Sequence, residues 1–123
     1  MQTLYVGICG VFGCVARYWL SSWIHQLVAR PIPFGTLAVN VGGSLLIGLL
    51  MGGDLHHPFL GGNLRVGLAV GFLGGFTTFS TFSYETVRLL ENGSVGAAFF
   101  NVLLNVILCL LAAWVGIIVA RQL

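Results

Sequence analysis

The most informative part of the chain is the segment Gly71-Phe72-Leu73-Gly74-Gly75-Phe76-Thr77-Thr78-Phe79-Ser80-Thr81-Phe82-Ser83-Tyr84-Glu85. Two adjacent glycines and two β-branched threonines stand near its centre, inside a long apolar stretch. Helix propensity is poor there, since each Gly costs about 1 kcal/mol relative to Ala in a helix interior. Thr77 or Thr78 can also cap a new helix that begins just afterwards. The pattern predicts a helix that is broken near its middle, with a simple kink as the alternative.

A break at this position would free backbone groups that can bind ions. Where a helix is interrupted inside a membrane, carbonyl groups are exposed at the end of the first half and N–H groups at the start of the second. Carbonyl oxygens suit a cation, so the sequence predicts that the break can hold one.

The residues after the break form an aromatic row beside a hydroxyl row. Phe79 and Phe82 are three residues apart, as are Ser80 and Ser83, so each pair shares one side of a helix. Ring edges are positive and hydroxyls donate hydrogen bonds, so an anion could pass along this surface without meeting a fixed charge. Conduction requires such weak and multiple sites. Spacing alone, however, favours a packing or lipid-facing role for the two Phe side chains.

Four apolar stretches are long enough to cross a bilayer. Such a helix needs about 20 predominantly apolar residues, and four segments qualify, at 4–24, 34–51, 65–90 and 95–120. The composition agrees, because 58% of the 123 residues are apolar and only 7% are charged, whereas soluble domains carry roughly 25% charged residues. The sequence therefore predicts an all-α membrane protein with four transmembrane helices, in a single domain over residues 1–123.

Charged and metal-binding residues are too few for several other functions. All five basic residues are Arg, so no basic tract is available to neutralise nucleic-acid phosphates. His56 and His57 are adjacent in a polar connector, where they converge poorly on one metal ion, and we interpret them as part of a solvated loop. Cys9, Cys14 and Cys109 lie within apolar runs and are interpreted as packing residues.

Small and amide side chains recur at helical spacing, which predicts close packing of the helices. Glycines occur every four residues of the third span, at Gly67, Gly71 and Gly75. An Asn exposed to lipid would leave its amide without partners, so Asn40, Asn101 and Asn105 should face protein or a wet cavity. Asn40 lies in mid-span, and we predict that its NH2 group donates to an anion. For Asn101 and Asn105, hydrogen bonding between helices and lining of a pore are equal alternatives.

The arginines do not favour one orientation in the membrane. One side receives Arg30 and Arg88, and the other receives Arg65, Arg121 and both termini. Orientation follows the excess of positive residues near the helix ends, and here the numbers nearly balance. The simplest interpretation is a chain that inserts both ways round and forms an antiparallel homodimer, with a two-fold axis in the membrane plane.

Three motifs, in this order and spacing, resemble those of the Fluc (CrcB) family of fluoride channels. They are Gly10-Val11-Phe12-Gly13-Cys14-Val15-Ala16-Arg17-Tyr18, Gly35-Thr36-Leu37-Ala38-Val39-Asn40-Val41-Gly42-Gly43-Ser44 and Gly74-Gly75-Phe76-Thr77-Thr78-Phe79-Ser80-Thr81-Phe82-Ser83. The resemblance covers essentially the whole chain, and it implies a passive channel that exports fluoride across the inner (plasma) membrane. The choice of fluoride over other anions comes from this resemblance alone.

The resemblance also implies roles for individual residues. Two pores would lie at the interface of an antiparallel homodimer, lined by Phe79, Phe82 and Asn40. A structural sodium ion would be held at the dimer centre by the backbone carbonyls of Gly74 and Thr77 of both subunits. A polar track would consist of Ser80, Thr81 and Ser83, with Glu85 near its end. Cys9 and Asn101 depart from the family pattern, which usually has Gly and often Tyr in those regions.

Other functions fit the sequence less well. A small proton-coupled multidrug or cation exporter can also have four helices and dual topology, but it needs a carboxylate in the first span, and residues 4–24 have none. Glu85 lies too near the end of the third span to act as a midplane proton relay. A non-transporting assembly subunit would not require the Phe and Ser rows. An enzyme is least favoured, because no nucleophile, base and orienting group can be assembled by spacing.

Dual topology predicts that reporter fusions at the C-terminus give signal from both sides of the membrane. Two Lys added after Gln122 should bias insertion, because the balance of positive charge near the helix ends sets orientation. The modified chain alone should lose activity and regain it when an oppositely biased version is coexpressed. Reporter signal from one side only would contradict the antiparallel dimer.

Overall fold

The computed structural model describes residues 1–53 and 60–123, and all regular secondary structure within them is helical. Three of the four spans are continuous helices, namely α1 (Gln2–Leu27), α2 (Phe34–Gly52) and α6 (Val95–Gln122). The third span consists of α3 (Gly62–Val66), the π-helical stretch η1 (Gly67–Phe72), α4 (Leu73–Phe76) and α5 (Phe79–Glu91). The predicted solvated loop at His56 and His57 lies outside the described residues.

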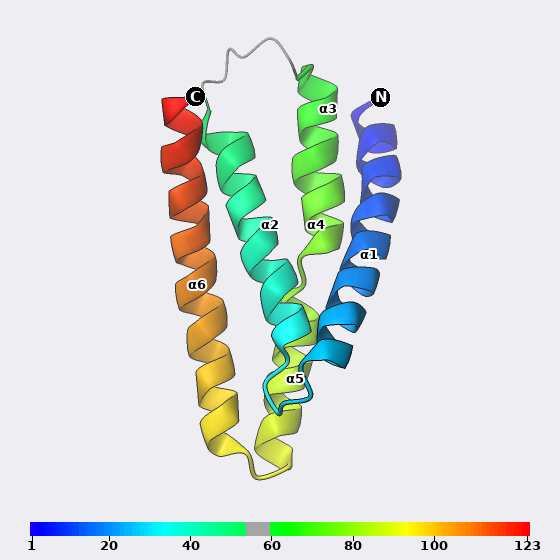
Figure 1. Ribbon diagram of the computed structural model, residues 1–123. Helices are drawn as coiled ribbons and strands as arrows, with labels where there is room; N and C mark the ends of the chain where they lie inside the picture. The colour runs from blue at the N-terminus through cyan, green and yellow to red at the C-terminus, as the bar shows by residue number, and fades with distance from the viewer. Residues whose placement is uncertain (54–59) are drawn as a thin grey trace.

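Four helical segments are long and apolar enough to cross a membrane, which confirms the predicted all-α class and its four spans. The spans alternate in direction, so both termini lie at the same end of the molecule (Figure 1). At that end Arg65 donates a hydrogen bond of 2.9 Å to the Leu50 carbonyl, in the last turn of α2. This contact neutralises the negative end of the α2 dipole and joins the second span to the third.

Two extended residues separate α4 from α5 within the third span. Thr77 has φ −88° and ψ 156°, and Thr78 has φ −151° and ψ 114°. The Thr78 hydroxyl caps the second helix by accepting a hydrogen bond of 3.2 Å from the Thr81 N–H. We call Thr77 and Thr78 the interruption. Backbone groups on both sides of the interruption lack the continuous series of intrahelical hydrogen bonds that an unbroken helix has.

Glycines allow the helices to approach each other at backbone distance. A Cβ added at Gly13 would overlap the carbonyl of Phe72, and one at Gly71 would overlap that of Val6, so the first and third spans pack tightly. On the other side of the bundle, Gly48 lies against Ala113. The predicted stripe in the third span therefore faces the first. Three thiols are free, and two of them pack against this stripe, those of Cys9 and Cys14.

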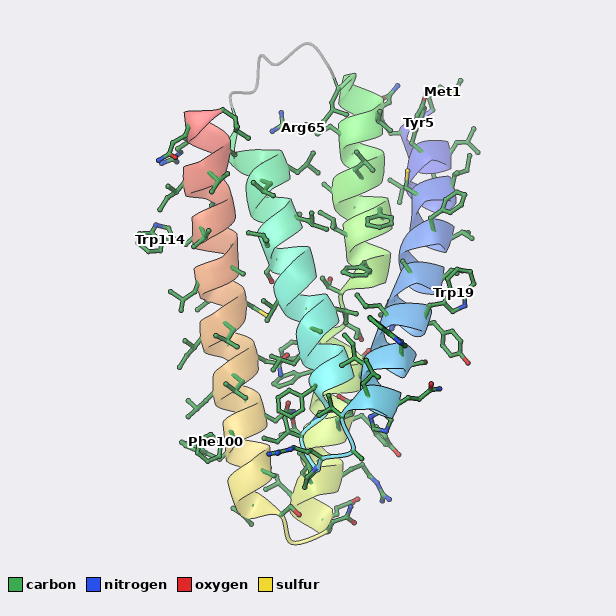
Figure 2. The ribbon with its side chains drawn as sticks, viewed as in Figure 1. Met1, Tyr5, Trp19, Arg65, Phe100 and Trp114 are labelled. Carbon is green, nitrogen blue, oxygen red and sulfur yellow. The ribbon has the colours of Figure 1, made fainter. Side chains whose placement is uncertain are left out.

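Large apolar side chains point away from the bundle over most of its surface. Trp19 on α1 and Trp114 on α6 project outward on opposite sides (Figure 2), and both are largely exposed. A surface of this kind suits lipid rather than water. Polar side chains that bond across the bundle, such as that of Asn101, lie between the spans.

Close packing predicts that replacement of glycine by alanine has different effects on stability at two positions. Gly48→Ala should destabilise the protein by about 1–3 kcal/mol, because its methyl group would press on the α6 backbone. The matched control Gly96→Ala should leave stability unchanged or slightly raised, since nothing lies within 4 Å of its Cβ position and Ala favours the helix. Thermal unfolding of the purified proteins in detergent would measure both. Equal effects at the two sites would show that backbone contact at Gly48 is unimportant.

Candidate functional site

An open cleft of about 510 Å³ lies beside the interruption, between α2, the end of α4, α5 and α6. Most of its wall is apolar, with a few polar groups at the level of the interruption. Five of the site residues predicted from the sequence line it, namely Asn40, Gly74, Thr77, Phe79 and Phe82. Residues more than 30 positions apart in the chain are thus brought to one place.

The side-chain amide of Asn40 pairs with the backbone of the interruption. Its Oδ1 accepts a bond of 2.8 Å from the Thr78 N–H, and its Nδ2 donates a bond of 3.1 Å to the Thr78 carbonyl. The orientation is fixed because a backbone N–H can only donate, so the amide oxygen must face it. The second Nδ2 hydrogen is donated to Asn105 Oδ1 at 3.2 Å. Donation from Asn40 to an anion would therefore require one of these two bonds to open.

The two phenylalanines differ sharply in environment. Phe79 is 78% exposed, whereas Phe82 is only 7% exposed. Their ring centroids are 5.3 Å apart and the ring planes are inclined by 58°. Sequence spacing treats the pair as equivalent, but one ring projects from the chain and the other is enclosed. Together they form a continuous aromatic wall from the interior to the open side of the cleft.

The hydroxyl groups of α5 cluster near the interruption instead of extending as one free row. Thr78 Oγ1 donates a bond of 3.0 Å to Thr81 Oγ1 and lies 3.3 Å from Ser80 Oγ. The Ser83 hydroxyl is committed to its own helix, where it donates to the Phe79 carbonyl at 2.9 Å. Ser80 is exposed, and Thr81 and Ser83 are partly exposed. Thr78 lines the cleft, whereas Ser80, Thr81 and Ser83 lie beside it and do not line it.

Gly74 and Thr77 occupy the end of α4, where the predicted cation site falls. Gly74 is exposed, and no atom lies within 4 Å of the position that its Cβ would take. The Thr77 hydroxyl donates to the Leu73 carbonyl at 2.9 Å and so faces its own helix. No cluster of three His, Cys, Asp or Glu side chains that could hold a metal occurs within 1–53 and 60–123. A cation here would therefore be bound by neutral oxygens, such as backbone carbonyls.

Sequence reasoning missed the partner of Glu85. The Thr36 hydroxyl, in the first turn of α2, donates a bond of 2.8 Å to Glu85 Oε1. Glu85 Oε2 and Arg17 Nε are buried without hydrogen-bond partners among the described residues. Glu85 is thus held at the positive end of the α2 dipole and bonds to Thr36. Thr36 is a polar residue in the first turn of an apolar span, and this feature of the sequence could have indicated a polar partner.

The amides of α6 bond to other helices of the bundle. Asn101 is fully buried and donates a bond of 2.9 Å to Thr86 Oγ1. Asn105 donates to Asn101 Oδ1 at 3.1 Å and to the Asn101 carbonyl at 2.9 Å. The sequence left two alternatives open, hydrogen bonding between helices and lining of a pore. Asn101 bonds between helices, while Asn105 both accepts a bond from Asn40 and borders the cleft.

The fold and the cleft define a multi-pass membrane protein whose polar groups converge on an interrupted span. Residues 4–117 match the family described as CrcB-like protein, Camphor Resistance (CrcB), and the chain belongs to this family. A relative from Syntrophotalea carbinolica is 55% identical over 123 residues, which is the full length of both chains. Relatives from Geotalea daltonii (53%, 98% of each chain) and Geobacter sulfurreducens (54%, 98% of this chain and 97% of the relative) are similarly close.

All three relatives bear the name Fluoride-specific ion channel FluC. The family is therefore one of transporters and not of enzymes. With four candidate spans, the chain is a multi-pass protein of the inner membrane.

Proposed function

We propose that the chain is a passive, fluoride-selective ion channel that exports fluoride across the membrane. The observation that carries the proposal is identity above 50% to relatives named as fluoride-specific channels, over nearly the whole of each chain. The absence of a carboxylate from the first span further disfavours the proton-coupled exporter, which needs one there. Selectivity for fluoride rests on the relatives, because amides, hydroxyls and ring edges are generic partners of small anions.

The conducting unit is an antiparallel, dual-topology homodimer with two pores at its interface. Support comes from the side of the bundle that carries the cleft, where Phe79 and Gly74 are exposed. The cleft is open on this side, so a second copy could close it into a pathway. The near balance of arginines on the two sides of the membrane supports the antiparallel arrangement.

The pathway runs past Asn40, Phe79 and Phe82 and continues along the polar track of Ser80, Thr81 and Ser83. The inclined rings allow an anion to contact positive ring edges at two successive depths. Hydroxyls beside the rings replace part of the hydration shell, and Glu85 lies near the end of the track. None of these groups except Glu85 carries a charge, so an anion would be held weakly enough to leave.

A sodium ion at the dimer centre would be bound by the carbonyls of Gly74 and Thr77 from both subunits. The residues fit such an ion because α4 ends here, and the last carbonyls of a helix lack intrahelical donors. The exposed backbone at Gly74 has no neighbouring side chain to block approach. The ion would contribute positive charge that draws the two negative helix ends together, with no part in the movement of the anion.

Replacement of the pore aromatics should separate conduction from packing. In Phe79→Ile and Phe82→Ile the side chain stays apolar, so packing changes by only about 1–3 kcal/mol, but the positive ring edge is lost. Fluoride efflux from liposomes should fall by at least about tenfold, equivalent to about 1.4 kcal/mol of barrier. Size-exclusion profiles would confirm assembly.

The matched controls are Phe99→Ile and Phe100→Ile on α6, whose rings also form a pair, 6.3 Å apart, and are both exposed, as Phe79 is. These variants should conduct normally, because their rings lie outside the cleft. Normal efflux from well-assembled Phe79→Ile and Phe82→Ile proteins would refute the aromatic pathway.

Removal of sodium should weaken the dimer if carbonyls hold a structural ion. Exchange into a large organic cation should lower both dimer stability and fluoride efflux, and sodium should restore them. Thr77→Ser should behave like the unmodified protein, because its backbone carbonyl is retained. A dimer of equal stability in the two salts would rule out the sodium site and would leave the channel proposal intact.

A further inference from the structure

A directional chain of hydrogen bonds connects the interruption to the carbonyl group of a pore phenylalanine. We call it the amide relay, and its members in order are Thr78, Asn40, Asn105, Asn101, Thr86 and Phe82. It leaves the third span at Thr78, crosses α2 and α6, and returns to the third span at Thr86. The two ends of the relay therefore lie on the helix that carries Phe79 and Phe82.

Every bond of the relay donates in the same direction. The Thr78 N–H donates to Asn40 at 2.8 Å, Asn40 to Asn105 at 3.2 Å, and Asn105 to Asn101 Oδ1 at 3.1 Å. Asn101 then donates to Thr86 Oγ1 at 2.9 Å, and the Thr86 hydroxyl donates to the Phe82 carbonyl at 2.7 Å. Since the first donor is a backbone N–H and the last acceptor is a carbonyl, neither end can reverse. The orientation of each amide is thus set by its neighbours.

Burial makes the relay rigid. Asn101 has 0% exposure and Asn105 has 6%, so little water can replace a lost bond. A buried amide without its partner is strongly unfavourable, and a break at one link therefore disturbs the links on either side. Both hydrogens of the Asn105 NH2 group are directed at Asn101 and are turned away from the cleft.

We propose that Asn101 and Asn105 are positioning residues of the ion pathway, acting through Asn40 and Thr86. They hold the Asn40 amide against Thr78 and thereby fix both the shape of the interruption and the turn of α5 that carries Phe82. This inference rests on the proposed channel function. Neither residue needs to touch the permeating ion, because the relay transmits their effect through bonds that begin and end on the third span.

The test uses two members of the relay that make no direct hydrogen bond to each other. Asn105→Leu removes the two links that Asn105 makes, to Asn40 and Asn101, and Thr86→Val removes the two links that Thr86 makes, to Asn101 and Phe82. Fluoride efflux per assembled dimer is measured for the single variants and the double variant. Each single change should lower efflux by about threefold or more, and the double variant should lie within about twofold of the weaker single, because one relay can be broken only once. The ratio of fluoride to chloride permeation should also change, which a loss of stability alone would not cause.

A matched control is Ser21→Ala. The Ser21 hydroxyl donates to the Arg17 carbonyl four residues earlier, just as Thr86 donates to Phe82, but within residues 1–53 and 60–123 it accepts no bond from an amide of another helix. Ser21→Ala should conduct normally. If Asn105→Leu fails to assemble, the comparison of Thr86→Val with Ser21→Ala decides the question. Equal efflux in these two variants, or independent multiplied losses in the double variant, would overturn the relay, whereas an unmodified protein that passes no fluoride would overturn the channel proposal itself.

Discussion

The pairing of the Asn40 amide with the Thr78 backbone is the contact on which the arrangement of the bundle centre depends. Inside a bilayer no water is available for a backbone that leaves the helix, and each unpaired group costs several kcal/mol. One side-chain amide supplies both an acceptor and a donor to Thr78. The third span can therefore contain two extended residues without leaving this peptide N–H unpaired.

This pairing constrains the helix that supplies it. Asn40 can reach Thr78 because α2 comes very close to the third span at Gly43, where an added Cβ would overlap the Thr77 side chain. One turn further on, α2 packs against α6 at Gly48. The same helix thus supports the interruption on one side and fixes the position of α6 on the other. Asn105 consequently lies where it can accept the remaining Asn40 hydrogen.

Features that depend on neighbouring residues in the chain could be predicted from the sequence, whereas features that depend on pairing between helices could not. The four spans follow from runs of apolar residues, and close packing at Gly71 follows from glycine spacing, although the spacing does not say which helix packs there. The unequal burial of Phe79 and Phe82 is set by the helices around α5, about which a three-residue spacing carries no information. The bond between Thr36 and Glu85 joins residues 49 positions apart. The family resemblance points to Asn40, but it does not predict that Asn40 also bonds to Asn105, which only the fold reveals.

In the proposed pathway, the cleft would combine support for the interruption with weak anion contacts, because neutral dipoles can serve for both. A charged side chain at Asn40 could not both accept from and donate to Thr78, and a fixed charge beside the rings would trap an ion of opposite sign. The amide already has its hydrogens engaged, so an anion that reaches it must compete with the Thr78 carbonyl and Asn105. Such competition weakens the contact and favours release. In the proposed pathway, the bonds that hold the third span in shape therefore also prevent Asn40 from binding an ion too tightly to conduct.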